Sequence, residues 1–416
     1  MNYKKTRNYI FSFGLLCFAG ITSCMNVKTL YDTLVLPEKK ECKRFQFYGI
    51  GQTGFSTTSY DECGRVDSAL RIWNNNQNAI KMLEGFCPES NIGQLRTRLD
   101  ANDDGTRGHF CVNGCLDVDF AGEFGFFYLF REEFSVSLHL PVYSMKLKNV
   151  VWNDLTHDVS ADDLRVKEYL TNNFVKNVKD LGCLDLCGWN RSGVGDLAFF
   201  FGWRRNFEQE KKLLENVKLS ARAGLTLPTG KKACEDQILA FPFGNDGAIG
   251  VVVGGGLDLT FGEHLRAGLD VQLMHVFGNT RCRRIKTDLC QTDLLFLQKT
   301  DTFKEFGLTQ RFNLYAELYR VFTGLSLKLG YQFKRKSEDT VYTCSNAFSN
   351  DIANTAESLQ EWTMHNLVFN LYYDACSDEC GDHRVCPTFG IFAKVPFNGM
   401  RAAMVRTVGF SLGIDF

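Results

Sequence analysis

In the last stretch of the chain, Met404 to Phe416, apolar residues occupy every second position from Val408 onward. The other positions, from Thr407 to Asp415, hold Gly, Ser, Thr or Asp. Because neighbouring side chains of a β-strand point to opposite faces, this pattern predicts a strand with one apolar face and one small or polar face. Chain termini usually fray. A closed membrane barrel instead requires a patterned final strand, which pairs with the first strand and leaves no open edge.

The same alternation recurs in about a dozen stretches, each of a length that suits a strand. Leu325 to Phe333 shows it most clearly, because apolar residues there alternate strictly with Ser, Lys, Gly and Gln. The other predicted strands are Phe45 to Phe55, Leu116 to Phe130, Phe134 to Val142, Gly195 to Arg205, Val217 to Leu227, Ile249 to Phe261, Leu265 to Val276, Phe306 to Tyr319, Trp362 to Tyr373 and Phe389 to Phe397.

Long and short connections alternate between these strands, as they do in bacterial barrels with long outer loops and short periplasmic turns. We therefore expect an all-β fold, a closed antiparallel transmembrane β-barrel of about 12 strands, with 10 or 14 as alternatives. Two connections depart from the pattern, since 374–386 is long for a periplasmic turn and 398–400 is short for an outer loop. Asn398-Gly399 predicts a two-residue hairpin. The apolar spacing in Val66 to Leu83 predicts a short helix in the first outer loop.

The composition fits a barrel. The chain has 47 basic and 48 acidic residues, and this balance argues against a nucleic-acid partner. No internal run of about 18 apolar residues is present to form a transmembrane helix. The 36 Phe residues suit an aromatic-rich lipid face. A soluble all-β protein is the alternative, but it would have to expose or bury a dozen such faces.

The N-terminus predicts export. Basic residues at Lys4, Lys5 and Arg7 precede an apolar stretch from Tyr9 to Ile21, and small residues follow. We expect residues 1–23 to be a signal peptide, 24–41 a short periplasmic segment and 42–416 the barrel with its long extracellular loops. Residues 21–24 also resemble the lipobox of bacterial lipoproteins, in which Cys24 would be acylated, so simple cleavage and lipidation both stay open.

The terminal strand and its final aromatic residue resemble outer-membrane β-barrel proteins of Gram-negative bacteria. The resemblance implies an integral outer-membrane protein in contact with membrane lipids, with Phe416 as the signal that the barrel-assembly machinery reads. Gly195-Asp196-Leu197 and Gly224 to Gly230 also resemble a pattern found in transporter-like barrels. Some of those barrels are encoded together with enzymes that degrade aromatic compounds. That pattern implies the passage of a small solute.

Charged residues on the polar strand faces are candidates to line the pore. They could pair across the interior and partly fill it, or they could create a field across a water-filled pore that selects the permeant. The candidates are Asp117, Asp119, Glu123, Asp196, Arg204, Lys218, Arg222, Asp258, Arg266, Asp270, Glu305, Arg311, Glu317, Lys328 and Lys334.

The chain has 16 cysteines, and in an exported protein an even set predicts disulfides. Ten from Cys42 onward fall in outer loops, namely Cys63, Cys87, Cys111, Cys115, Cys183, Cys187, Cys234, Cys282, Cys290 and Cys344. Four fall on the periplasmic side, namely Cys42, Cys376, Cys380 and Cys386. We expect bridges to tie the outer loops into a lid. Metal binding is the alternative, although the spacings do not match zinc sites. Cysteine-rich surface barrels resemble those of chlamydiae and other intracellular bacteria with thin envelopes.

A possible calcium loop begins at Asp100, with Asn102 and Asp104 as further oxygen ligands and a turn glycine at Gly105. The twelfth position of such a calcium loop normally holds a bidentate Glu, but here it is Cys111. An Asx-rich turn is therefore the alternative. We expect no other cofactor.

Catalytic motifs are absent from the sequence. Ser137 and His139 share a predicted strand face, but that face points to the lumen, whereas an outer-membrane lipid hydrolase needs its triad at the lipid surface. The glycines Gly254 to Gly256 lie in mid-strand with no helix after them, which predicts a kink or a close approach of the backbone rather than a phosphate loop.

These patterns predict a non-enzymatic porin or small-solute channel with disulfide-tied outer loops. A closed structural or adhesive surface barrel is the alternative, and an outer-membrane lipid hydrolase is a remote one. A homo-oligomer is compatible with either form of barrel.

Overall fold

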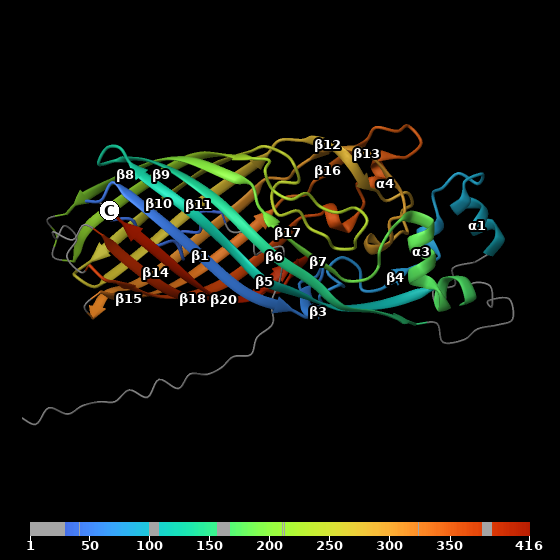
Figure 1. The fold of residues 1–416 in the computed structure, drawn as a ribbon, viewed down its shortest axis with the longest axis horizontal. Helices are drawn as coiled ribbons and strands as arrows, with labels where there is room; N and C mark the ends of the chain where they lie inside the picture. The colour runs from blue at the N-terminus through green and yellow to red at the C-terminus, as the bar shows by residue number, and fades with distance from the viewer. Residues whose placement is uncertain are drawn as a thin grey trace, which may run out of the picture.

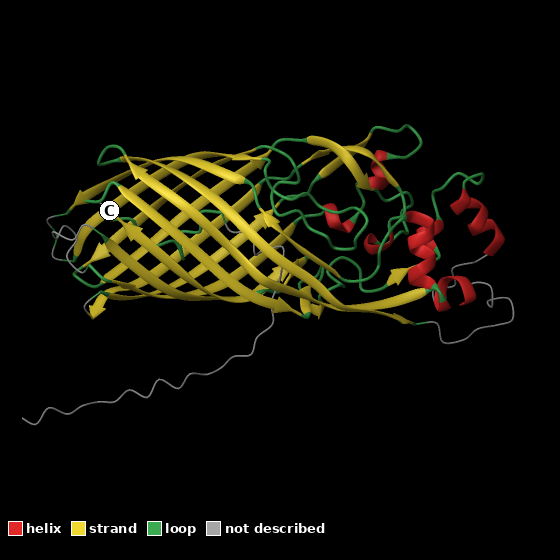
Figure 2. Ribbon diagram, viewed as in Figure 1, coloured by secondary structure: helices red, strands yellow, loops and turns green. Residues whose placement is uncertain are grey.

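The computed structural model describes residues 30–40, 42–99, 108–155, 167–209, 211, 213–322, 324–376 and 385–416. Within them, twelve long antiparallel strands close into a barrel, with the short strands β4(Gln77–Asn78) and β7(Trp189–Val194) attached outside it (Figures 1 and 2). The barrel strands are β1(Phe45–Ser56), β5(His109–Leu129), β6(Phe134–Asp154), β8(Leu197–Glu208), β9(Leu214–Leu227), β10(Gly250–Phe261), β11(Leu265–Val276), β14(Thr309–Phe322), β15(Leu325–Lys336), β17(Trp362–Asp374), β18(Cys386–Met400) and β20(Arg406–Asp415).

The last strand closes the barrel against the first. β20 pairs with β1 from Gln46↔Asp415 to Phe55↔Arg406, and the backbones of Phe45 and Phe416 exchange two hydrogen bonds of 3.0 Å. Every described strand of the wall therefore has two neighbours, which removes the open edge that a membrane does not tolerate. The predicted fold class, the strand number and the closure are confirmed.

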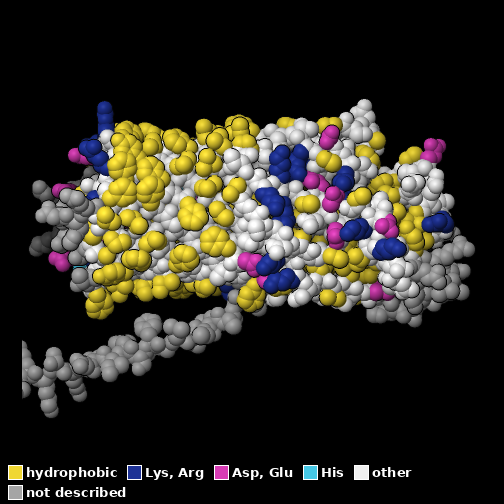
Figure 3. Space-filling model, in the orientation of Figure 1, with side chains coloured by type: hydrophobic (Ala, Val, Ile, Leu, Met, Phe, Trp, Pro, Cys, Tyr) yellow, Lys and Arg dark blue, Asp and Glu magenta, His cyan; other side chains and the backbone are white. Residues whose placement is uncertain are grey.

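An apolar belt covers the outside of the barrel. Phe47, Phe124, Phe199, Phe369 and Phe410 are 46–57% exposed there. Figure 3 shows hydrophobic side chains spread over the barrel, while charged ones gather at its far end and on the part beyond it. None of the described helices is long and apolar enough to cross a membrane.

The predicted hairpin at Asn398-Gly399 is wrong. β18 continues through these residues, which lie opposite His365 and Met364 of β17. The chain turns after Met400, where Arg401 has a positive φ of 45°. Pairing with β17 therefore outweighs the local turn preference of the Asn-Gly pair.

The predicted helix at Val66 to Leu83 is also wrong. That stretch forms β3(Val66–Ser68), β4 and the 3₁₀ turn η1(Lys81–Leu83), whereas the helix of the first outer loop is α1(Asn91–Leu99). Leu70, Ile72 and Met82 are fully buried or nearly so. Their spacing reflects packing against other loops rather than the period of a helix.

The outer loops form one packed layer, here called the cap, over the outer mouth of the barrel. It contains α3(Phe174–Gly182), α4(Asn350–Ala353), the π-helical turn η3(Lys167–Asn172), the 3₁₀ turns η4(Asp293–Leu295) and η5(Glu357–Leu359), and two small sheets. The sheets are built from β12(Asn279–Arg284), β13(Lys299–Glu305) and β16(Thr340–Thr343), and from β19(Ala402–Ala403), β2(Thr58–Tyr60) and β3.

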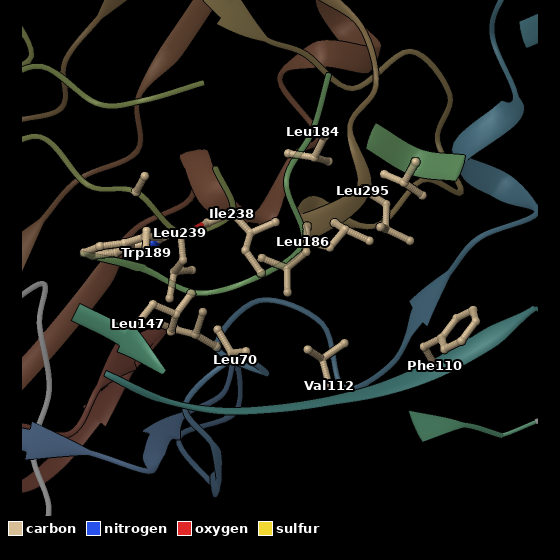
Figure 4. Packing of buried hydrophobic residues seen from close by; sticks show 14 of the residues in the cluster. Leu70, Phe110, Val112, Leu147, Leu184, Leu186, Trp189, Ile238, Leu239 and Leu295 are labelled. Carbon is tan, nitrogen blue, oxygen red and sulfur yellow. Dashed lines mark hydrogen bonds between the residues drawn. The ribbon is translucent and has the colours of Figure 1, made fainter. Parts of the chain in front are cut away.

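A shared apolar core holds the cap together. Leu70, Val112, Leu186, Trp189 and Leu295 come from four distant parts of the chain and pack in one cluster (Figure 4). β5 and β6 extend beyond the barrel and supply part of that core. Burial of apolar surface stabilises a core of this kind by about 25 cal/mol per Å².

Buried polar contacts also join cap segments. The carboxylate of Asp293 accepts the backbone N–H groups of Glu357 at 3.2 Å and Ser358 at 2.7 Å. Burial raises the pKa of Asp293, and the hydrogen bonds from Ser358 and Glu357 only partly oppose the rise. This carboxyl group therefore joins η4 to η5.

The glycines Gly254 and Gly256 make room for an ion pair inside the wall. Arg222 of β9 crosses β10 and reaches Asp270 of β11 with two hydrogen bonds of 2.6 and 2.9 Å. A Cβ on Gly254 would lie 2.9 Å from the Arg222 Cζ and 2.7 Å from the carbonyl oxygen of Val271. The glycines thus permit the close approach expected of them.

Replacing Gly254 with Ala is expected to lower the free energy of unfolding by about 3 kcal/mol, because it breaks a buried ion pair. Gly49→Ala is the matched control, since a Cβ there would come no nearer than 3.5 Å to Phe124. Urea unfolding in detergent micelles, followed by tryptophan fluorescence, measures both. Equal losses in the two variants would contradict this role of Gly254.

Candidate functional site: the barrel interior

Residues 30–40, here called the lumen segment, lie inside the barrel. Leu34 and Val35 are 0% and 1% exposed although they belong to no strand or helix. The Asn370 side chain of β17 donates a hydrogen bond of 2.9 Å to the Leu34 carbonyl. The described part of the segment expected in the periplasm is thus packed against the inner wall.

The lumen segment runs along the barrel axis toward the end with short turns, which is the periplasmic end in outer-membrane barrels. Arg311 of β14 holds the Leu30 carbonyl at 3.0 Å. Lys40 ends the segment with an ion pair of 2.8 Å to Asp374, the last residue of β17. β1 begins at Phe45, shortly after that contact.

The two acidic residues of the lumen segment both bind basic residues of the wall. Asp32 pairs with Lys394 of β18 at 2.6 Å and accepts hydrogen bonds of 3.2 Å from the Gln332 amide. Glu38 pairs with Arg266 at 2.8 Å and Lys218 at 3.3 Å. Charge complementarity therefore fixes the segment at two levels of the barrel.

Tyr31 fixes the segment near the middle of the wall. Its ring lies 4.6 Å from the Arg222 guanidinium carbon, 5.2 Å from the His139 ring and 5.1 Å from the Phe200 ring. Contact of a cation with an aromatic face contributes most when both are desolvated.

His139 lies between Ser137 and Glu123, at 2.8 Å from each. This order of groups is that of a nucleophile, a base and an acid. However, His139 is fully buried, Ser137 is 3% exposed, and Tyr31 packs against the imidazole. The three side chains therefore act as a buried polar cluster that supports the lumen segment.

Two cavities of several hundred Å³ each lie along the described interior, and the lumen segment lines both. The first, the inner chamber, has a volume of about 390 Å³ and is bordered by Leu36 to Lys40 and by wall residues near the short turns. The second, the outer chamber, has a volume of about 450 Å³ and is bordered by Leu30, by wall residues and by the cap. The segment thus lies between two spaces that are large enough for small solutes.

Asp339 marks the cap side of the outer chamber. Burial alone would raise its pKa, but the charges of Lys304 and Lys336 outweigh burial and hold the pKa below its ordinary value. Asp339 is therefore ionised there, and its pair with Lys304 measures 2.7 Å.

Most of the predicted pore-lining residues contribute to the interior. Arg204, Lys218, Arg222, Asp258, Arg266, Asp270, Glu317 and Lys328 border the inner chamber. Arg311 and Lys334 border the outer chamber, and Glu123 binds inward-facing Tyr48 and His139. Asp196 also borders the outer chamber, where its carboxylate accepts backbone N–H groups of Gly230 and Asn245.

Asp117, Asp119 and Glu305 lie elsewhere. Asp117 is opposite outward-facing Phe55 and pairs with Lys148, while Asp119 pairs with Lys146 at 2.6 Å. A β-bulge between Val118 and Phe120 reverses the alternation of β5. Alternation counted through the strand without this bulge therefore assigns Asp117 and Asp119 to the wrong face. Glu305 ends β13 in the cap.

Lys394, Asp32 and Glu38 are site residues that are not among the predicted ones. Lys394 could have been found, because alternation from outward-facing Phe389 places it on the lumen face. Asp32 and Glu38 carry no such signal, since they lie outside any periodic stretch.

The disulfides expected from the cysteine count stay a prediction. The described cysteines from Cys63 onward carry free thiols, and those of Cys87, Cys183 and Cys344 are exposed on the cap. Cys380 lies outside the described residues. The apolar core already packs the cap segments together.

The predicted calcium ligands Asp100, Asn102 and Asp104 lie outside the described residues, as do the signal peptide and Cys24. Where side chains are described, no group of three or more His, Cys, Asp or Glu residues could hold a metal ion.

No protein-family model matches the sequence, and no curated protein matches it significantly. Among solved structures, the COG4313 outer membrane channel from Pseudomonas putida F1 is similar, with a TM-score of 0.52 and 12% identity over 94% of this chain and 100% of that one. The NanC porin has a TM-score of 0.31 and 9% identity over 71% and 92% of the two chains. A FadL homologue of Pseudomonas aeruginosa has a TM-score of 0.30 and 7% identity over 90% of each.

The first of these likenesses extends over the whole barrel and concerns the fold. Together with the closed wall and its apolar belt, it agrees with the resemblance found in the sequence. The chain is an integral β-barrel protein of the bacterial outer membrane.

Proposed function

We propose that this protein is a channel for small solutes and that the lumen segment closes it in the state described. The observation that carries the proposal is the pair of chambers, of about 390 and 450 Å³. The outer chamber meets the lumen segment at Leu30, and the inner chamber meets it between Tyr31 and Lys40. Charged and hydrogen-bonding side chains line much of the inner chamber, as in polar pores that select their permeants. In the outer chamber they share the lining with apolar side chains such as Phe243, Met274 and Trp362. The likeness to an outer membrane channel agrees with this function.

Recording from the purified protein in planar bilayers tests the proposal. Brief, discrete current steps are expected, because the lumen segment is held by side-chain contacts and not by strand pairing. A barrel that serves as a structural or adhesive surface protein would stay silent. The packed cap and the ion pairs of Asp32 and Glu38 favour this second function, so the recording separates the two.

We also propose that a disulfide forms at the periplasmic end of the barrel. The buried thiols of Cys376 and Cys386 are hydrogen-bonded to each other, at either end of the connection between β17 and β18. An exported protein meets an oxidising compartment, in which neighbouring thiols become linked.

Treatment with oxidised glutathione is expected to join Cys376 to Cys386, with loss of one hydrogen from each thiol and reduction of one glutathione disulfide. Non-reducing digestion and mass spectrometry would show the linked peptides, and they should be absent from the Cys386→Ser variant. A bridge from Cys376 to an outer-loop cysteine such as Cys87 would contradict the topology.

A further inference from the structure

We propose that Lys218 and Arg266 form a binding site for the carboxylate of a permeating organic anion, and that Glu38 occupies this site in the closed state. The inference rests on the proposed channel function. It identifies the class of solute as small organic acids. In the closed state the Glu38 carboxylate occupies the position that the carboxylate of the solute would take.

The geometry around Glu38 is that of a carboxylate site. Arg266 Nη1 lies 2.8 Å from one carboxylate oxygen, and Lys218 Nζ lies 3.3 Å from the other. The two cations come from β11 and β9, so the wall supplies both without help from the cap. The Glu38 side chain is 40% exposed and borders the inner chamber, so a solute in that chamber can reach the same cations.

Aromatic rings hold the cations of this region in place. The Arg266 guanidinium carbon lies 3.5 Å from the centre of the Tyr319 ring. Nearby Lys328 lies 4.7 Å from the Tyr315 ring and pairs with Glu317 at 3.3 Å. Cation–π contacts of this kind preorganise the site. Arg266 and Lys328 therefore keep their positions when the Glu38 carboxylate leaves.

The wall of the inner chamber carries an excess of positive charge once the lumen segment is left out. The basic side chains are Arg204, Lys218, Arg222, Arg266, Arg320 and Lys328, against the acidic Asp258, Asp270, Glu317 and Asp374. Asp270 is held by Arg222, and Asp258 accepts the Tyr315 hydroxyl. Arg204 donates to the Lys39 carbonyl at 3.4 Å. An emptied chamber would thus attract anions.

Binding of an anion would also release the lumen segment. Glu38 and Asp32 are the acidic residues of the segment, and both are bound to wall cations. A solute carboxylate that takes the place of Glu38 removes one of these two ionic anchors. The permeant therefore favours the open state by competing with the segment for the same cations.

The Glu38→Gln variant tests this site. Reversal potentials in a KCl gradient should give a chloride-to-potassium permeability ratio at least threefold higher than in the wild type, because the cations lose their internal counter-charge. Millimolar benzoate should increase the open probability of the wild type, whereas neutral benzamide should not. Glu263→Gln is the matched control, since Glu263 is 87% exposed in a periplasmic turn and its loss should leave both readouts unchanged.

Adding Lys218→Gln and Arg266→Gln to Glu38→Gln should return the permeability ratio to the wild-type value. Channels that conduct with an unaltered ratio and respond equally to benzoate and benzamide would overturn the anion site but leave the channel function intact. Silence of every variant would overturn the channel function itself. If Glu38→Gln does not fold, the benzoate and benzamide comparison on the wild type still decides between these outcomes.

Discussion

Deletion of residues 30–40 is expected to raise the single-channel conductance by about tenfold, because the narrowest part of a pore dominates its resistance. The lumen segment borders chambers of about 390 and 450 Å³. Without it, the two spaces join into one path from the cap to the periplasmic end. Recording in planar bilayers, with the wild type measured in the same membrane, gives the ratio of conductances.

Graded variants show whether the contacts of the segment set the closed state. Asp32→Asn removes the ion pair with Lys394, which measures 2.6 Å, and should give more frequent openings with the same final conductance as the deletion. Arg335→Gln is a suitable control, because its pair with Glu361 lies outside both chambers. A deletion variant that folds, as judged by heat-modifiable mobility on gels, yet conducts like the wild type would show that the segment does not restrict the path.

The barrel could be predicted from the sequence because each strand carries its own signal. Phe47 and Ile391, for example, point outward in strands whose intervening residues point inward, and this period of two is local. The position of Asp117 could not be predicted, because one extra residue in the bulge after Val118 reverses the faces without changing the composition. The tertiary register decides where such a bulge falls.

The lumen segment could not be predicted, because its partners are remote in sequence. Asp32 binds Lys394, and Leu34 is held by Asn370. Nothing in the residues from Tyr31 to Lys40 distinguishes them from a solvated linker until the barrel encloses them. The cap could not be predicted for a related reason, because the apolar residues near Leu70 and Ile80 pack into a core assembled from several loops.

Removal of residues 405–416 is expected to abolish the folded barrel. β20 is paired over its length with β1 on one side and β18 on the other. Without β20, both neighbours would expose backbone groups to lipid, where each unsatisfied group costs several kcal/mol. Loss of heat-modifiable mobility and loss of protease resistance in outer-membrane fractions would show the effect. A truncated protein that remains protected would contradict closure by β20.

Phe416→Ala separates strand pairing from the proposed role of Phe416 as an assembly signal. The variant keeps the backbone hydrogen bonds to Phe45 and loses ring contacts with Phe45 and Phe47, both at 5.7 Å. Those contacts contribute about 0.5–1.5 kcal/mol each, so refolding into detergent should remain nearly normal. Assembly in cells should fall several-fold if the assembly machinery recognises the terminal ring. Equal, small losses in both measurements would mean that Phe416 contributes packing alone. Recognition by the assembly machinery would instead lower assembly in cells and leave refolding of the purified chain nearly unchanged.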